Sequence, residues 1–211
     1  MPRFNPPLDD GEILAAFPGV YSRAASVYAG GQGAVFRAER LDGSVGALKI
    51  YVPDAAAQVE ERTAREVEAL EHIARPTIVT LDGHGTVTIR GDQCRYVCTT
   101  FIDGVTLASR ATTPGIGMPL EQVARIGHDI ADAVEALWAR PYRIVHRDIK
   151  PQNIMLSTSG NAVLIDLGIA RHTTLESLTL TGGAWGTPGF MSPEQATARK
   201  AFDLPPVIRP A

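Results

Sequence analysis

The sequence lacks the features that mark secreted, membrane-spanning and nucleic-acid-binding proteins. It has two cysteines in 211 residues, too few for a disulfide framework. Its 20 Lys and Arg residues nearly balance its 23 Asp and Glu residues, which indicates no basic surface for a nucleic acid or an anionic lipid. Prolines and acidic residues interrupt the N-terminal stretch where a secretory signal needs a basic start and an apolar run, and no later apolar run has transmembrane length. We therefore expect a cytoplasmic protein with no membrane segment and no nucleic-acid partner.

The composition is that of an ordinary globular protein, with 45% hydrophobic and 20% charged residues. A chain of this length can form one large domain or two lobes. Cys94 and Cys98 are four residues apart, which places both on one face of an extended segment. We interpret them as buried thiols of a strand rather than as a metal or redox site.

The first half of the chain has the pattern of a sheet with one helix. Residues 1–24 are punctuated by proline and glycine and are expected to form a leader with a short helical turn at residues 12–17. Strands are expected from residue 25 to the turn GGQG (residues 30–33), through residues 35–38, and at residues 46–50, 78–81, 86–89 and 95–100. The sequence FIDG (residues 101–104) breaks this sheet. A helix is expected over residues 55–74, because Val59, Val67, Leu70 and Ile73 or Ala74 share one face.

The second half combines a long amphipathic helix with a hairpin. The helix is expected over residues 120–139, with one apolar side made of Val123, Ile126, Ile130, Val134, Leu137 and Trp138. Two apolar runs at residues 154–156 and 163–165 flank a cluster of turn formers, which predicts a hairpin. Pairing the two strands brings Asn153 close to Asp166, with Asp148 and Lys150 on the preceding loop. Carboxylate and amide oxygens are ligands that Mg²⁺ accepts.

These residues carry a resemblance to a known family. HRDIKPQN (residues 146–153), Asp-Leu-Gly (residues 166–168) and GTPGFMSPE (residues 186–194) resemble the catalytic loop, the magnesium loop and the end of the activation segment of a eukaryotic-type, bacterial-like Ser/Thr protein kinase. Leu167 stands where the family has Phe and keeps an apolar residue there. The resemblance covers residues 25–195 and implies an α+β, protein-kinase-like bilobal fold. It implies an N-lobe (25–100) of antiparallel β-sheet with one helix, a hinge (100–104) and a partial helical C-lobe (105–195).

The resemblance implies transfer of the γ-phosphate of ATP, with Mg²⁺, to Ser or Thr hydroxyls of a protein substrate. In this role Asp148 accepts or orients the proton of the attacking hydroxyl, and Lys150 neutralises charge on the moving phosphate. Asn153 and Asp166 hold Mg²⁺, whereas His146 packs structurally beneath Leu167. Without the resemblance, Asp148 and Asp166 would be turn residues beside a hairpin, which Asp favours. The order of Asp, Lys, Asn and Asp argues against that interpretation.

A nucleotide-binding set is implied in the same way. The glycines of residues 30–33 let backbone N–H groups approach phosphates, although the first glycine of the family pattern falls on Tyr28. Lys49 matches the strand lysine that reaches the phosphates, and Glu66 matches the helix glutamate that pairs with it. Taken alone, the glycines would be a hairpin turn, Lys49 a solvated edge residue and Glu66 a partner of its own helix. The implied set is Gly30, Gly33, Val35, Ala47, Lys49, Glu66, Thr99, Phe101, Ile102 and Met155.

A substrate and regulatory region is implied between Asp166 and Glu194. Thr187 before Pro188 resembles the Ser/Thr branch, in which this hydroxyl bonds the catalytic Asp and Lys. Arg147 is the type of residue that orders such a loop once a phosphate is added. The chain itself is thus an expected substrate through autophosphorylation, with a loop of small polar residues as the plainer alternative. The implied set is Arg147, Thr187, Glu194, Thr173, Thr174, Thr179 and Thr181.

The resemblance stops at about residue 195, and residues 196–211 are expected to form a Pro-rich tail. The family continues there with helices that complete the larger lobe and pair with the residue matching Glu194. Each large apolar side chain left uncovered forfeits roughly 1.5–3 kcal/mol. We therefore expect a C-lobe that aggregates or needs a covering partner.

Three alternatives stay open beside the kinase. They are a non-catalytic nucleotide-binding regulatory module, a phosphotransferase acting on small molecules, and an inactive fragment of a longer protein. The presence of Lys49, Asp148, Asn153 and Asp166 favours the kinase, and the early end of the resemblance favours the regulatory module.

Overall fold

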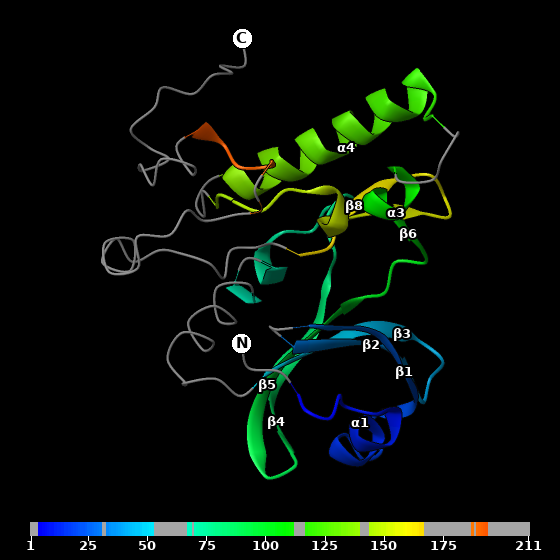
Figure 1. Ribbon diagram of the computed structural model, residues 1–211, viewed down its shortest axis with the longest axis vertical. Helices are drawn as coiled ribbons and strands as arrows, with labels where there is room; N and C mark the ends of the chain where they lie inside the picture. The colour runs from blue at the N-terminus through cyan, green and yellow to red at the C-terminus, as the bar shows by residue number, and fades with distance from the viewer. Residues whose placement is uncertain are drawn as a thin grey trace.

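The computed structural model describes residues 4–30, 33–52, 67–68, 70–111, 117–139, 144–166, 187 and 189–193. Two lobes lie one above the other (Figure 1). The lower lobe holds a five-stranded sheet and helix α1 (Asp10–Ala16), and the upper lobe holds a three-stranded sheet and helices α3 (Leu107–Ala111) and α4 (Leu120–Trp138).

The large sheet is antiparallel throughout, as the sequence predicted for the N-lobe. The expected start of the domain at residue 25 falls inside the first strand, because pairing already begins between Tyr21 and Arg40. The two strands expected at residues 78–81 and 86–89 are in fact one strand, and Ile78 instead bridges to Leu164 in the upper lobe. The strands, in the order β1-β2-β3-β5-β4, are β1 (Tyr21–Gly30), β2 (Gly33–Arg40), β3 (Val45–Tyr51), β4 (Leu81–Ile89) and β5 (Asp92–Thr100).

The register of β2, β3 and β5 gives the sheet two different faces. Phe36, Leu48 and Cys98 are direct partners across the three strands, and all are buried in one core cluster. Cys94 belongs to the same cluster, so both thiols are buried as predicted. Opposed residues share a face because side chains alternate along a strand.

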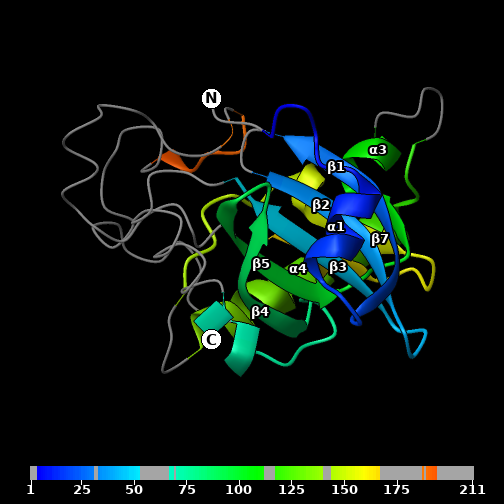
Figure 2. The same ribbon diagram turned by 90° about the horizontal axis from the view of Figure 1, so that it is seen from below.

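Helix α1 covers the outer face of this sheet (Figure 2). The helix begins at Asp10, earlier than expected, because Asp9 and Glu12 form a capping box. In it the Glu12 N–H donates to Asp9 Oδ1 at 2.8 Å, and the Asp9 N–H donates to Glu12 Oε2 at 3.0 Å. Ile13 is fully buried against the sheet, and Glu12 pairs with Arg90 of the β4–β5 turn at 2.6 Å. The expected leader therefore contains part of the lobe's own core.

The upper lobe contains the predicted hairpin and the predicted long helix. Strands β7 (Ile154–Ser157) and β8 (Ala162–Leu164) pair antiparallel, preceded by the 3-10 turn η1 (Pro151–Asn153). Strand β6 (Gly104–Thr106), which was not predicted, adds to β7. It approaches so closely that a Cβ on Gly104 would collide with the Leu156 carbonyl.

Helix α4 buries only part of its predicted apolar side. Ile126, Ala133 and Leu137 are buried against the hairpin. Three members of the predicted apolar side remain exposed, Val123 by 45%, Val134 by 39% and Trp138 by 43%. Within the described ranges no helix is both long and apolar enough to cross a membrane.

Residues 70–79 join the two lobes. Residues 67, 68 and 70–72 are helical, and Val67, Leu70 and Ile73 are buried as the periodicity predicted. Beyond them the chain runs beside β8: the Leu164 N–H donates to the Thr77 carbonyl at 2.9 Å, and the Val79 N–H donates to the Leu164 carbonyl at 3.2 Å. The Thr77 hydroxyl also donates to Asp132 of α4 at 2.7 Å.

The buried position of Ile13 gives a test of whether α1 belongs to the domain. Ile13→Ala should lower the free energy of unfolding by about 2–5 kcal/mol, since it leaves a cavity between α1 and the sheet. Urea denaturation would measure this change. Val27→Ala on β1 is the matched control, because Val27 is 58% exposed and its truncation should change little. Equal effects of the two variants would contradict the integral role of α1.

Candidate active site

The loop that precedes β7 places a buried His and a buried Asp side by side. His146 is 4% exposed and Asp148 is 7% exposed. Between them Arg147 has a φ of 64°, a left-handed conformation that is uncommon for a residue with a side chain. This turn lets the Asp148 N–H donate to His146 Nδ1 at 3.2 Å. His146 is thus buried as the sequence predicted, while Leu167 lies outside the described residues.

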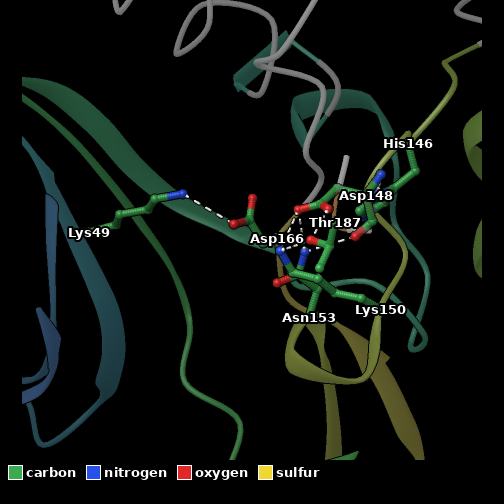
Figure 3. A network of polar contacts seen from close by, with 7 residues as sticks. All are labelled: Lys49, His146, Asp148, Lys150, Asn153, Asp166 and Thr187. Carbon is green, nitrogen blue, oxygen red and sulfur yellow. Dashed lines mark hydrogen bonds and ion pairs between the residues drawn. The ribbon is translucent and has the colours of Figure 1, made fainter. Parts of the chain in front are cut away.

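Asp148 is the centre of a network of hydrogen bonds (Figure 3). Lys150 Nζ donates to Asp148 Oδ2 at 2.8 Å, and the Thr187 hydroxyl donates to Asp148 Oδ1 at 3.1 Å. Lys150 Nζ also donates to Thr187 Oγ1 at 3.0 Å, which closes a triangle. Both carboxylate oxygens are therefore held, and their orientation is defined without solvent.

Asn153 and Asp166 lie at the adjacent ends of the hairpin, as strand pairing predicted. The Ile165 N–H donates to the Asn153 carbonyl at 3.0 Å, which continues the ladder between β7 and β8 by one step. The side-chain amide of Asn153 donates to the Asp148 carbonyl at 2.9 Å and to Asp148 Oδ2 at 3.2 Å. With the NH₂ group engaged in this way, the amide oxygen is the atom of Asn153 that can accept a cation.

The donor set at this edge fits Mg²⁺. An Asp166 carboxylate with a 36% exposed side chain and an Asn153 amide oxygen are hard ligands, and Mg²⁺ commonly takes one or two protein oxygens and completes its shell with water or phosphate. Among the described residues no cluster of three or more His, Cys, Asp or Glu side chains forms a denser metal site.

Lys49 reaches this edge from the other lobe. Its ammonium lies 3.6 Å from Asp166 Oδ2, with side-chain exposures of 23% and 36% (Figure 3). An ion pair with this exposure contributes only about 0–1 kcal/mol to stability. Its importance is positional, because it brings a cation of β3 next to a carboxylate that follows β8.

The glycine turn between β1 and β2 brings backbone atoms unusually close together. Gly30 pairs with Gly33 across the turn, and residues 31–32 lie outside the described ranges. Gly33 has a φ of 153°, and a Cβ there would collide with the Ile50 carbonyl. The Tyr28 ring packs so closely on Gly30 that a Cβ there would meet it as well. Gly33 is therefore required by space, because it meets backbone atoms, whereas the exposed Tyr28 side chain could turn away from a Cβ at position 30.

Most of the other residues of the implied nucleotide set lie on β2, β3, β5, the connection between the lobes and β7. Val35 pairs with Lys49, and Ala47 pairs with Thr99, so these four share the sheet face opposite α1. Phe101 and Ile102 lie on the connection between the lobes, and Ile102 packs into the upper core. Met155 alternates with the buried Ile154 and Leu156 on β7, so it points to the opposite face of the hairpin.

Several predicted residues lie outside the described residues. They are Glu66, Glu194, Thr173, Thr174, Thr179 and Thr181, together with the expected tail at residues 196–211. Thr187 is described and meets Asp148 and Lys150, and the Phe190 N–H donates to its carbonyl at 2.9 Å. Sequence reasoning missed Tyr51, whose ring lies against Lys49. The signal was available, because residues two apart on a strand share a face.

The comparisons with known proteins agree with this geometry. The family model described as "Protein kinase domain" matches residues 21–203. The chain is 31% identical over 186 residues to the probable serine/threonine-protein kinase PknB of Corynebacterium glutamicum, covering 86% of this chain and 28% of that protein. It is 36% identical over 171 residues to the serine/threonine-protein kinase PknD of Mycobacterium tuberculosis (strain H37Rv), covering 80% of this chain and 25% of that protein.

A solved structure titled "PpkA-294 apo form" shares the fold. Its TM-score is 0.58 at 21% identity, and the match covers 71% of this chain and 59% of that one. The chain therefore has the α+β bilobal fold of protein kinases, with an antiparallel N-lobe sheet. It belongs to the protein kinase family and is similar to the bacterial serine/threonine kinases. It spans about a quarter of the length of these two curated relatives.

Burial of His146 predicts a pH dependence of stability. Desolvation lowers the pKa of His146 from its ordinary value of 6.5, and the nearby Asp166 and Asp148 only partly offset this effect. As the pH falls below about 6.5, the unfolded chain gains a proton on this ring before the folded chain does. Stability should therefore be fully present above that pH and decline as the pH falls toward the lowered pKa.

Urea denaturation between pH 7.5 and pH 5 would measure this decline. His146→Asn, whose side-chain oxygen can replace Nδ1 as an acceptor, should make the pH dependence shallower over that range. His128→Asn is the matched control, because the side chain of His128 is 84% exposed. This variant should leave the slope of stability against pH as in the wild type. An unchanged slope in His146→Asn would contradict the assignment of this decline to His146.

Proposed function

We propose that the chain is the catalytic part of an ATP- and Mg²⁺-dependent Ser/Thr protein kinase, which transfers the γ-phosphate to Ser or Thr hydroxyls of proteins. The observation that carries this proposal is the convergence of residues from both lobes. Lys49 of the sheet meets Asp166 at 3.6 Å, and Asp148, Lys150 and Thr187 form a closed triangle beside them (Figure 3). Phosphoryl transfer depends chiefly on such positioning of charge.

Asp148 is the residue that receives the acceptor hydroxyl. Its two oxygens are oriented by Thr187 and Lys150, so one lone pair can accept a hydrogen bond from the attacking hydroxyl and take its proton. Lys150 places a positive charge within 2.8 Å of that carboxylate, where charge shifts as the phosphoryl group moves. Thr187 ties both residues to the segment that would dock the substrate.

Lys49, Asp166 and Asn153 would position the nucleotide. Lys49 offers its ammonium to the phosphates, and the glycine turn offers backbone N–H groups to them. Asp166 and Asn153 supply the oxygens that would hold Mg²⁺, which when bound neutralises phosphate charge. Val35, Ala47, Thr99, Phe101, Ile102 and Met155 would contact the base.

Autophosphorylation and a protein substrate are the finer parts of the proposal. Arg147 sits directly beside Asp148, where it can pair with a phosphate on the segment between Asp166 and Glu194. The cytoplasm, which supplies ATP and Mg²⁺, is the proposed location.

A nucleotide-binding module without catalysis is the second candidate. The exposed Val123, Val134 and Trp138 of α4 favour it, because exposed apolar side chains on one helix are typical of a surface that binds a partner. A partner protein that covers these side chains of α4 is part of both proposals, the kinase and the nucleotide-binding module.

Intact-mass analysis after incubation with ATP and Mg²⁺ tests catalysis directly. We expect the wild type to gain whole phosphate units, and Asp148→Asn and Asp166→Ala to lose at least about a hundredfold of the rate. Asp92→Asn, a change of the same kind at an exposed position, should behave as the wild type. No added mass, in a chain that melts at a higher temperature with nucleotide, would instead support the binding module.

Thr187 gives a second test, which addresses the substrate end of the site. Thr187→Val removes one hydrogen bond to Asp148 and one from Lys150, and should slow phosphate incorporation about ten- to a hundredfold. Thr187→Ser keeps the hydroxyl and should retain most of the rate. Initial rates measured on a Ser-containing peptide would show the difference, and a Val variant as fast as the Ser variant would exclude this role of the hydroxyl.

A further inference from the structure

Tyr51 stands beside Lys49 on the face of β3 that is turned away from α1. Its ring centroid lies 4.9 Å from Lys49 Nζ, a distance at which the negative face of an aromatic ring attracts a cation. The two residues are two positions apart on one strand, so their side chains leave the same face. The contact therefore follows from the strand itself.

The Tyr51 ring is held firmly in place. Tyr51 is 7% exposed and forms a small core cluster with Val67 and Val97, against which Leu81 also packs. Gly33 is its direct partner on β2, and the missing side chain there leaves the backbones in close approach. A ring fixed by three neighbouring segments presents a constant surface to the ammonium.

The Lys49 side chain is flexible, as lysine side chains generally are. This four-carbon side chain has many rotamers, and its ammonium lies 3.6 Å from the carboxylate of Asp166, whose side chain is 36% exposed. A buried ring can reduce the number of rotamers that Lys49 adopts without competing for the hydrogen bonds of its ammonium. The direction toward Asp166 is then retained even when that carboxylate turns to another cation.

We propose that Tyr51 is a positioning residue that holds the Lys49 ammonium, through the face of its ring, at the place where it meets Asp166 and the nucleotide phosphates. The phosphate part of this inference rests on the proposed function, whereas the contact between ring and ammonium does not. The ring face is the active feature, so phenylalanine should replace tyrosine and an aliphatic residue should not.

The variants are chosen to separate the ring from the hydroxyl and from the packing. Tyr51→Phe keeps the ring, and Tyr51→Leu keeps an apolar side chain without a ring. Tyr96→Leu is the matched control, because Tyr96 lies on β5 of the same sheet and packs toward α1, where its ring contacts Phe17 at 4.9 Å between centroids. It removes a ring from the lobe without touching Lys49.

Proton NMR of the ε-methylene group of Lys49 reports the contact without nucleotide. The ring current of Tyr51 should shift these signals upfield in the wild type and in Tyr51→Phe, and the signals can be assigned by their loss in Lys49→Arg. They should move to the ordinary lysine position in Tyr51→Leu and stay shifted in Tyr96→Leu. Unshifted signals in the wild type overturn the inference, whether or not Tyr51→Leu folds.

Kinetics with ATP report the consequence. Tyr51→Leu should raise KM for ATP about two- to thirtyfold with kcat little changed, whereas loss of folded protein would lower kcat alone. Tyr51→Phe should restore the wild-type KM, and equal KM values in all variants overturn the positioning role. Shifted Lys49 signals in a wild type that transfers no phosphate would contradict the proposed function but keep the contact, so the two failures are distinguishable.

Discussion

The geometry of the site depends on the hydrogen bonds that tie residues 77–79 to Leu164. The Leu164 N–H and carbonyl bond to Thr77 and Val79, so a segment that leads into the large sheet runs beside the strand that ends two residues before Asp166. Backbone bonds of this kind leave little freedom for sliding, because the apolar side chains around them are buried in one cluster. Lys49 and Asp166, which are far apart in the sequence, meet because of this junction.

The second constraint is the cost of burying Asp148. A carboxylate with a 6% exposed side chain must be paired and hydrogen-bonded, and here Lys150, Thr187 and Asn153 all donate to it. The left-handed backbone conformation of Arg147 costs some stability. It allows the Asp148 N–H to donate to His146. A carboxylate held from several directions cannot reorient when an acceptor hydroxyl approaches, and this preorganisation is what phosphoryl transfer requires.

The local patterns in the sequence predicted much of this arrangement. Turn formers between two apolar runs predicted the hairpin, and pairing then placed Asn153 near Asp166, as the Ile165–Asn153 bond confirms. Periodicity predicted α4 and the buried side of Val67, Leu70 and Ile73. Patterns failed where contacts were distant. No local pattern near residues 10–16 predicts that α1 covers a sheet. Strand β6 forms only because β7 lies beside it.

The sequence by itself determined most of the element types, the order of the motif residues and the family, because these follow from neighbours a few positions apart and from the match of residue types. Only the tertiary structure decided that Lys49 meets Asp166 at 3.6 Å, and that the Tyr51 ring beside Lys49 is buried in a cluster with Val67 and Val97. The first contact depends on how the two lobes pack, and the second on how segments distant in the sequence pack against β3. Packing selects among side-chain directions that local propensity leaves equally available.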